Sequence, residues 1–244
     1  MRPAVPRRTA FLLPSAFTIG NIFLGFYAVV SALRGRFAWA GVLIIVAGVI
    51  DNLDGRIARL TGTESEFGRE FDSLADVLTF GFAPALVAHL WGLQVWTRLG
   101  WLIPLYFVVC CATRLARFNV QTTRADLRYF VGLPCPAAAG GVASFLLVAP
   151  QHEPAPWVRV LRAGAWVGLG SRMVAPCRYW SFKRLDLRQP RSYRVALPLV
   201  GALLLLAFYP EACLPALAAL YALSGPALWL TGKLKPAHPA GAAP

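Results

Sequence analysis

The chain has 244 residues, of which 57% are hydrophobic and only 14% are charged, and its formal net charge is +13. This balance excludes an ordinary soluble domain, in which about a quarter of the residues are charged. Long apolar runs recur along the whole length, so the sequence predicts an all-α membrane protein with several transmembrane helices.

Eight apolar segments are candidates for membrane-spanning helices. They cover residues 11–33, 37–60, 72–93, 99–119, 131–149, 157–175, 194–209 and 212–231. The first follows a short basic N-terminus, and its length favours a membrane helix over a cleaved signal peptide. A polar linker predicts a division between a six-helix core, residues 1–185, and a C-terminal helix pair, residues 186–235. Residues 236–244 predict a disordered tail.

The distribution of Lys and Arg predicts which helix ends face the cytoplasm. With the N-terminus inside, 19 of the 24 Lys and Arg residues fall in inside segments, as the positive-inside rule favours. We therefore expect a multi-pass integral membrane protein of a bacterial inner membrane, with both termini in the cytoplasm. The positive charge indicates contact with anionic membrane lipids and a phosphate-bearing substrate, and not with nucleic acid.

Four aspartates flank the link between the second and third predicted spans: Asp51, Asp54, Asp72 and Asp76. Their spacings, i, i+3 and i, i+4, place each pair on one face of a helix, and we expect Gly68 to permit a turn before the second pair. Carboxylates beside membrane segments are costly and usually functional. All-oxygen ligation suits Mg²⁺ or Mn²⁺, and four carboxylates can hold two ions about 3.5–4 Å apart.

The same aspartates have a structural alternative, as helix caps or as partners of Arg56, Arg59 and Arg69. The cost of stacking acids at membrane depth makes this the weaker interpretation.

The five cysteines show no metal-ligand spacing with a histidine, and the three histidines are far apart in the sequence. We interpret the cysteines as reduced, buried, small apolar residues.

The acidic segment as a whole, D-x2-D-G-x2-A-R-x8-G-x3-D-x3-D, resembles the signature of the CDP-alcohol phosphatidyltransferase family. All eight fixed positions match: Asp51, Asp54, Gly55, Ala58, Arg59, Gly68, Asp72 and Asp76. At typical residue frequencies, a chance match at one start position is on the order of one in 10⁹. The resemblance implies CDP-diacylglycerol as a substrate, two Mg²⁺ or Mn²⁺ ions held by the four aspartates, and a homodimer.

The resemblance also implies roles for individual residues. Asp76 would be the general base for the attacking hydroxyl. The CDP moiety would contact Asp51, Gly55, Ala58, Arg59, Ser65 and Gly68. Gly55 and Ala58 lack bulk, which allows a nucleotide to approach the backbone or, alternatively, two helices to pack tightly. Asn21, a lone polar residue in the first helix, would touch the nucleotide or satisfy a neighbouring helix.

Stretches outside the signature, over about residues 11–185, resemble the membrane-integrated phosphatidylserine synthases within this family. They are residues 17–21, 74–84, 114–119, 130–136 and 178–183. The resemblance implies that L-serine attacks the lipid phosphate and that CMP leaves. A serine carboxylate needs cationic donors, and the candidate acceptor-binding residues are Arg114, Arg117, Asn119 and Lys183. The arginines have an alternative role as anchors to lipid headgroups. Ala175, Pro176 and Trp180 depart from the pattern, which weakens the assignment of residues 172–184.

Other functions stay open. The same chemistry could use glycerol 3-phosphate or an inositol phosphate as the acceptor. A metal-ion transporter would distribute carboxylates across the membrane depth, whereas the second half of this chain has no acidic counterpart to the motif. A catalytically silent scaffold is disfavoured by the intact motif.

Overall fold

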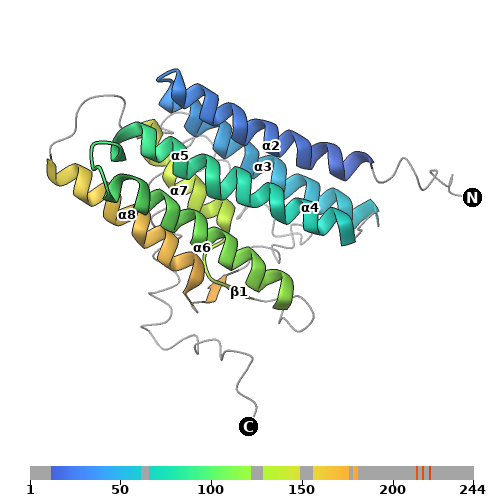
Figure 1. The fold of residues 1–244 in the computed structure, drawn as a ribbon. Coiled ribbons are helices and arrows are strands. Elements are labelled where there is room, and N and C mark those ends of the chain that lie inside the picture. Colours follow the sequence, from blue (N-terminus) through green and yellow to red (C-terminus); the bar gives the residue numbers. More distant parts are fainter. Residues whose placement is uncertain are drawn as a thin grey trace, which may run out of the picture.

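The computed structural model describes residues 12–61, 66–121, 129–148, 156–175 and 178–180, together with residues 213, 216 and 220. Within this part the chain is almost entirely helical, as predicted, and six helical segments run side by side in alternating directions (Figure 1). The predicted C-terminal helix pair and tail lie outside the described residues, apart from the three isolated positions.

The helices are α2 (Leu12–Leu33), α3 (Phe37–Thr61), α4 (Glu66–Asp76), α5 (Ala83–Ala88), α6 (Leu99–Gln121), α7 (Cys135–Val148) and α8 (Pro156–Val174). Two π-helical turns, η1 (Val77–Phe82) and η2 (His89–Leu93), flank α5. Together α4, η1, α5 and η2 form one helical segment of 28 residues. Turns of π-helix are frequent at functional sites, and η1 begins immediately after Asp76.

Four predicted spans, those at 11–33, 37–60, 99–119 and 157–175, agree with α2, α3, α6 and α8 to within two residues at each end. The third begins earlier than predicted, at Glu66 instead of residue 72. Gly68 therefore lies inside α4, and the prediction of a turn there is wrong. Glu66 in the first turn complements the helix dipole, and Phe67 stacks on Phe71 one turn later, so both favour the longer helix.

A short antiparallel pair of strands, β1 (Tyr129–Val131) and β2 (Arg178–Trp180), is an addition to the all-α prediction. Because β1 occupies the start of the predicted fifth span, α7 begins at Cys135 and not at residue 131 as predicted. Gly132 follows β1 with a φ of 83°, and a β-carbon there would overlap the carbonyl of Met173. Glycine suits both the dihedral and the close approach, so this loop can dock on the end of α8.

Three helices of the described part are long and apolar enough to cross a membrane: Ala16–Leu33, Glu66–Leu93 and Leu99–Val120. Shorter apolar stretches of α3 and α7, Phe37–Leu53 and Cys135–Leu147, accompany them. The chain is thus an integral membrane protein. The predicted span in α8 is not among these candidates, since its arginines lower its hydropathy.

Small residues bring the helices of the core close together. A β-carbon on Gly41 of α3 would stand 2.9 Å from the carbonyl oxygen of Ala143 in α7. Close approach through small side chains is typical of helix packing in membranes. This packing places the end of α3 beside α4 at one end of the bundle (Figure 1).

Candidate active site

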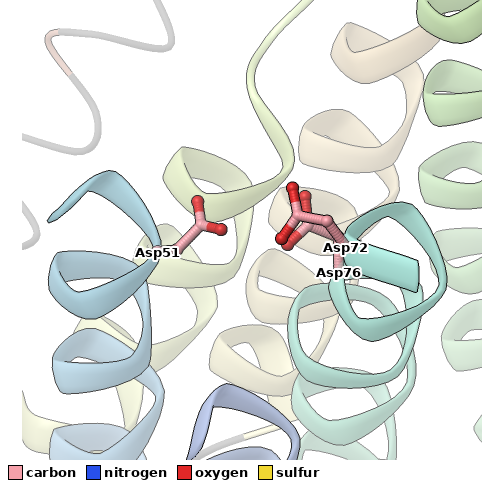
Figure 2. Close-up of side chains that lie close together, drawn as sticks. All are labelled: Asp51, Asp72 and Asp76. Carbon is pink, nitrogen blue, oxygen red and sulfur yellow. The ribbon is translucent and has the colours of Figure 1, made fainter. Parts of the chain in front are cut away.

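Three of the four predicted aspartates come together at that end of the bundle. Asp51 projects from α3, and Asp72 and Asp76 project from α4 toward it (Figure 2). One carboxylate oxygen from each residue lies within 4.8 Å of those from the other two. The i, i+4 spacing puts Asp72 and Asp76 on one helical face, and the antiparallel arrangement of α3 and α4 turns that face toward Asp51.

The donor set of this cluster fits a hard divalent cation. Oδ1 of Asp76 is buried and has no hydrogen-bond partner among the described residues. A buried, unpartnered carboxylate oxygen beside two further carboxylates is unfavourable unless a cation or a donor satisfies it. Because all the available donors are carboxylate oxygens, Mg²⁺ or Mn²⁺ is a better match than a soft metal.

The other motif residues on α3 continue the helix beyond Asp51. Asp54, Gly55 and Ala58 follow Asp51 by three, four and seven residues, which places them on its face of the helix, and Arg59 comes next. Side chains of α3 are described only as far as Leu53, so no contacts are assigned to these four. Two further predicted residues, Ser65 and Lys183, lie outside the described residues.

Asn21 lies in α2 against the helical segment that carries the carboxylates. Its backbone carbonyl accepts a hydrogen bond from Thr79 Oγ1 at 3.2 Å, and Thr79 follows Asp76 by three residues. The Asn21 side chain is completely buried, and neither of its polar atoms has a partner among the described residues. In this part of the chain the amide therefore does not satisfy a neighbouring helix, which was one of its two predicted roles.

Arg114 is a buried cation on the side of α6 that faces α7. It is only 8% exposed, and its Nη1 lies 3.6 Å from the sulfur of Cys135. Its Nε has no hydrogen-bond partner, and no ion pair joins Arg114 to a carboxylate within the described residues. Cys135 is the first residue of α7, so the guanidinium lies between α6 and the N-terminal end of α7.

The structure gives two other predicted acceptor residues contacts within the protein. Arg117 Nη1 donates to the carbonyl of Val174 at 3.1 Å. This contact places a positive charge at the C-terminal end of α8, where it interacts favourably with the helix dipole. Asn119 contacts Ser73 and Glu70 of α4. The sequence did not predict that Cys135 contacts Arg114, because a buried thiol and an apolar residue have the same pattern along a helix.

The comparison with known protein families agrees with this site. A sequence profile described as CDP-alcohol phosphatidyltransferase matches residues 11–175. That range includes the three clustered aspartates together with Asn21 and Arg114.

Individual relatives carry a more specific name. The chain is 40% identical over 182 residues to a protein of Helicobacter pylori strain J99, covering 74% of this chain and 77% of the relative. It is 31% identical over 172 residues to a protein of Bacillus subtilis strain 168, covering 70% of this chain and 92% of the relative. A protein of Mycobacterium tuberculosis strain H37Rv is 38% identical over 162 residues, covering 64% of this chain and 56% of the relative. All three are named CDP-diacylglycerol–serine O-phosphatidyltransferase.

Proposed function

Because the chain belongs to the CDP-alcohol phosphatidyltransferase family, we propose that it transfers the phosphatidyl group of CDP-diacylglycerol to the hydroxyl of L-serine. The products are phosphatidylserine and CMP. The observation that carries the chemistry is the meeting of Asp51, Asp72 and Asp76 within 4.8 Å. The choice of serine is supported by the names of the relatives.

The carboxylates have two tasks in this proposal. Asp51, Asp72 and Asp76, with Asp54 one turn further along α3, hold Mg²⁺ or Mn²⁺, and the family resemblance implies two ions. When bound, the metal neutralises negative charge that develops as the phosphoanhydride bond breaks. Asp76 also accepts the proton of the serine hydroxyl, a role supported by its buried, unpartnered Oδ1.

The nucleotide lies along the face of α3 that carries the motif. Gly55 and Ala58 leave room for it to approach the backbone, Arg59 meets the pyrophosphate, and Ser65 and Gly68 complete the contacts beyond the end of α3. Asn21 supplies a buried amide that forms no other hydrogen bond in the described part of the chain. The acyl chains remain in the bilayer, so they require no aqueous pocket.

Arg114 binds the carboxylate of serine. A buried guanidinium without a counter-ion is costly, and a carboxylate ligand would satisfy it through charge-assisted, bidentate hydrogen bonds. Arg117 adds positive charge to the same region, and Lys183 is a further candidate from the family resemblance. In this arrangement the serine hydroxyl would point toward Asp76, the proposed base.

The site faces the cytoplasm in this proposal, as the distribution of Lys and Arg favours. The core spans residues 1–185, residues 186–235 form an additional helix pair, and the enzyme acts as a homodimer, which the family resemblance implies.

The test is an acceptor assay with purified protein, labelled CDP-diacylglycerol and Mg²⁺ or Mn²⁺. We expect release of CMP that depends on serine, with phosphatidylserine as the lipid product. Release of CMP with glycerol 3-phosphate or an inositol phosphate, but not with serine, would refute serine as the acceptor. Metal flux into vesicles in the absence of any CMP release would instead indicate the transporter.

A further inference from the structure

Asn119, in the last turn of α6, reaches across to α4. Its Nδ2 donates to Ser73 Oγ at 3.0 Å and lies 3.5 Å from Glu70 Oε2. The Ser73 hydroxyl in turn lies 3.0 Å from the Arg69 carbonyl and 3.4 Å from Asn119 Oδ1. We call the group formed by Glu70, Ser73 and Asn119 the α4–α6 clamp.

The clamp acts on a helix that has few apolar contacts of its own. Of the α4 residues, only Ala75 is buried, whereas Phe67 and Leu74 are 75% and 65% exposed. Burial of its own side chains therefore does little to orient α4, which otherwise takes its orientation from the buried turns η1 and α5 that continue it. Hydrogen bonds from a neighbouring helix have correspondingly more influence on that orientation.

Ser73 stands beside the metal-binding face without belonging to it. Successive residues of a helix are about 100° apart, so Ser73 is displaced by that angle from Asp72, its immediate neighbour. A hydrogen bond that holds Ser73 against α6 therefore sets the direction in which Asp72 and Asp76 point. In the structure that direction is toward Asp51 (Figure 2).

We propose that Asn119 is a positioning residue, which orients α4 so that its two aspartates meet Asp51, and that it does not bind the acceptor alcohol. The inference rests on the proposed function, because it assigns the carboxylates to metal binding. It replaces the role that the sequence suggested for Asn119 with one that its contacts support.

The test compares Asn119→Ala, Ser73→Ala and the double variant with the wild-type protein. The readouts are Mn²⁺ affinity without substrates, followed by the electron paramagnetic resonance signal of free Mn²⁺, and the KM for serine. Loss of the clamp should weaken Mn²⁺ binding about three- to tenfold and leave the serine KM within about twofold. The double variant should be no worse than Asn119→Ala alone, because that variant already removes the interaction between Asn119 and Ser73.

Two further variants separate positioning from a general loss of stability. Val120→Ala alters the next residue of α6, which is 79% exposed, and should leave Mn²⁺ affinity unchanged. Combining Glu70→Gln with Asn119→Asp exchanges the donor and the acceptor across the clamp, and it should restore Mn²⁺ affinity relative to Asn119→Asp alone.

A raised serine KM with unchanged Mn²⁺ affinity in Asn119→Ala would overturn the proposal in favour of acceptor binding. Unchanged Mn²⁺ affinity and unchanged KM would also overturn it. Mn²⁺ binding is measured without turnover. A wild-type protein that binds the ion but makes no phosphatidylserine would therefore refute the proposed function without contradicting the positioning role of Asn119.

Discussion

Gly25 of α2 lies so close to Thr79 of η1 that a β-carbon on residue 25 would stand 3.0 Å from the Thr79 Cα atom. Thr79 is completely buried, and its hydroxyl donates to the Asn21 carbonyl on the same face of α2. Since Thr79 follows Asp76 by three residues, the contact holds the first helix against the helical segment that carries Asp72 and Asp76.

Gly25→Ala should therefore destabilise the protein. The added methyl group meets backbone atoms that cannot rotate away, and overpacking of this kind costs about 1–3 kcal/mol. Thermal unfolding in detergent measures the effect, and activity should fall with it because η1 must shift. Gly20→Ala in the same helix is the matched control: a β-carbon there has no neighbour within 4 Å, so stability should stay within about 0.5 kcal/mol. Equal losses in the two variants would refute the close contact.

Asp76→Asn should remove turnover without unfolding the protein. Asparagine has nearly the same shape but cannot accept the serine proton as a carboxylate does, and loss of a general base lowers kcat about 10²–10⁴-fold. CMP release gives kcat, and the melting temperature reports on the fold. Glu66→Gln, an exposed carboxylate at the start of α4, should behave as the wild type. Near-normal turnover by Asp76→Asn would exclude it as the base.

Removal of divalent ions should abolish activity, and added Mg²⁺ or Mn²⁺ should restore it. In Asp51→Ala the metal site loses one of its two carboxylates from α3 and keeps Asp54, so the ion concentration needed for half-maximal activity should rise at least about tenfold. Titration of metal-free protein with each ion measures this. An unchanged metal dependence in Asp51→Ala would show that the ion binds elsewhere.

Arg114→Gln should raise the KM for serine while leaving the KM for CDP-diacylglycerol nearly constant. Loss of a charge-assisted hydrogen bond of about 1.5–3 kcal/mol corresponds to about 10–100-fold. Arg114→Lys keeps the charge but not the planar fork, so its KM should be intermediate. Arg98→Gln, an exposed position in the loop before α6, is the control. A uniform fall in kcat without a change in KM would contradict the assignment to serine.

A mild oxidant should join Cys111 to Cys135, and not to Cys110. The sulfur of Cys135 lies 3.8 Å from the Cys111 carbonyl oxygen, so the two residues are in contact across α6 and α7. Cys110 is buried on another face of α6, where a β-carbon on Gly170 of α8 would stand 3.7 Å from its sulfur. Peptide mapping by mass spectrometry without reduction identifies the linked pair. A disulfide that involves Cys110 would contradict the orientation of α6 about its axis in the structure.

The tertiary contacts also refine the interpretation of the cysteines. Cys110, Cys111 and Cys135 are free and buried, as the sequence suggested. Cys135 nevertheless has a polar environment, since it lies against Arg114. Its pattern along α7 does not distinguish this environment from an apolar one, because the distinction depends on a side chain from α6.

The sequence by itself determined the features that depend on neighbouring residues. Apolar length predicted the helices, and spacings of three and four residues predicted which aspartates share a face, because helical geometry repeats every 3.6 residues. The signature of Asp51 to Asp76 was sufficient to identify the family.

The tertiary structure alone decided which faces meet. Asp51 approaches Asp76 because α3 and α4 run antiparallel at one end of the bundle, and Asn119 approaches Ser73 because α6 packs beside α4. It also decided that Arg114 is buried without a carboxylate partner in the described part of the chain. The two pairs are 25 and 46 positions apart in the sequence. Their free energies arise from packing and hydrogen bonds between helices, which no local pattern contains.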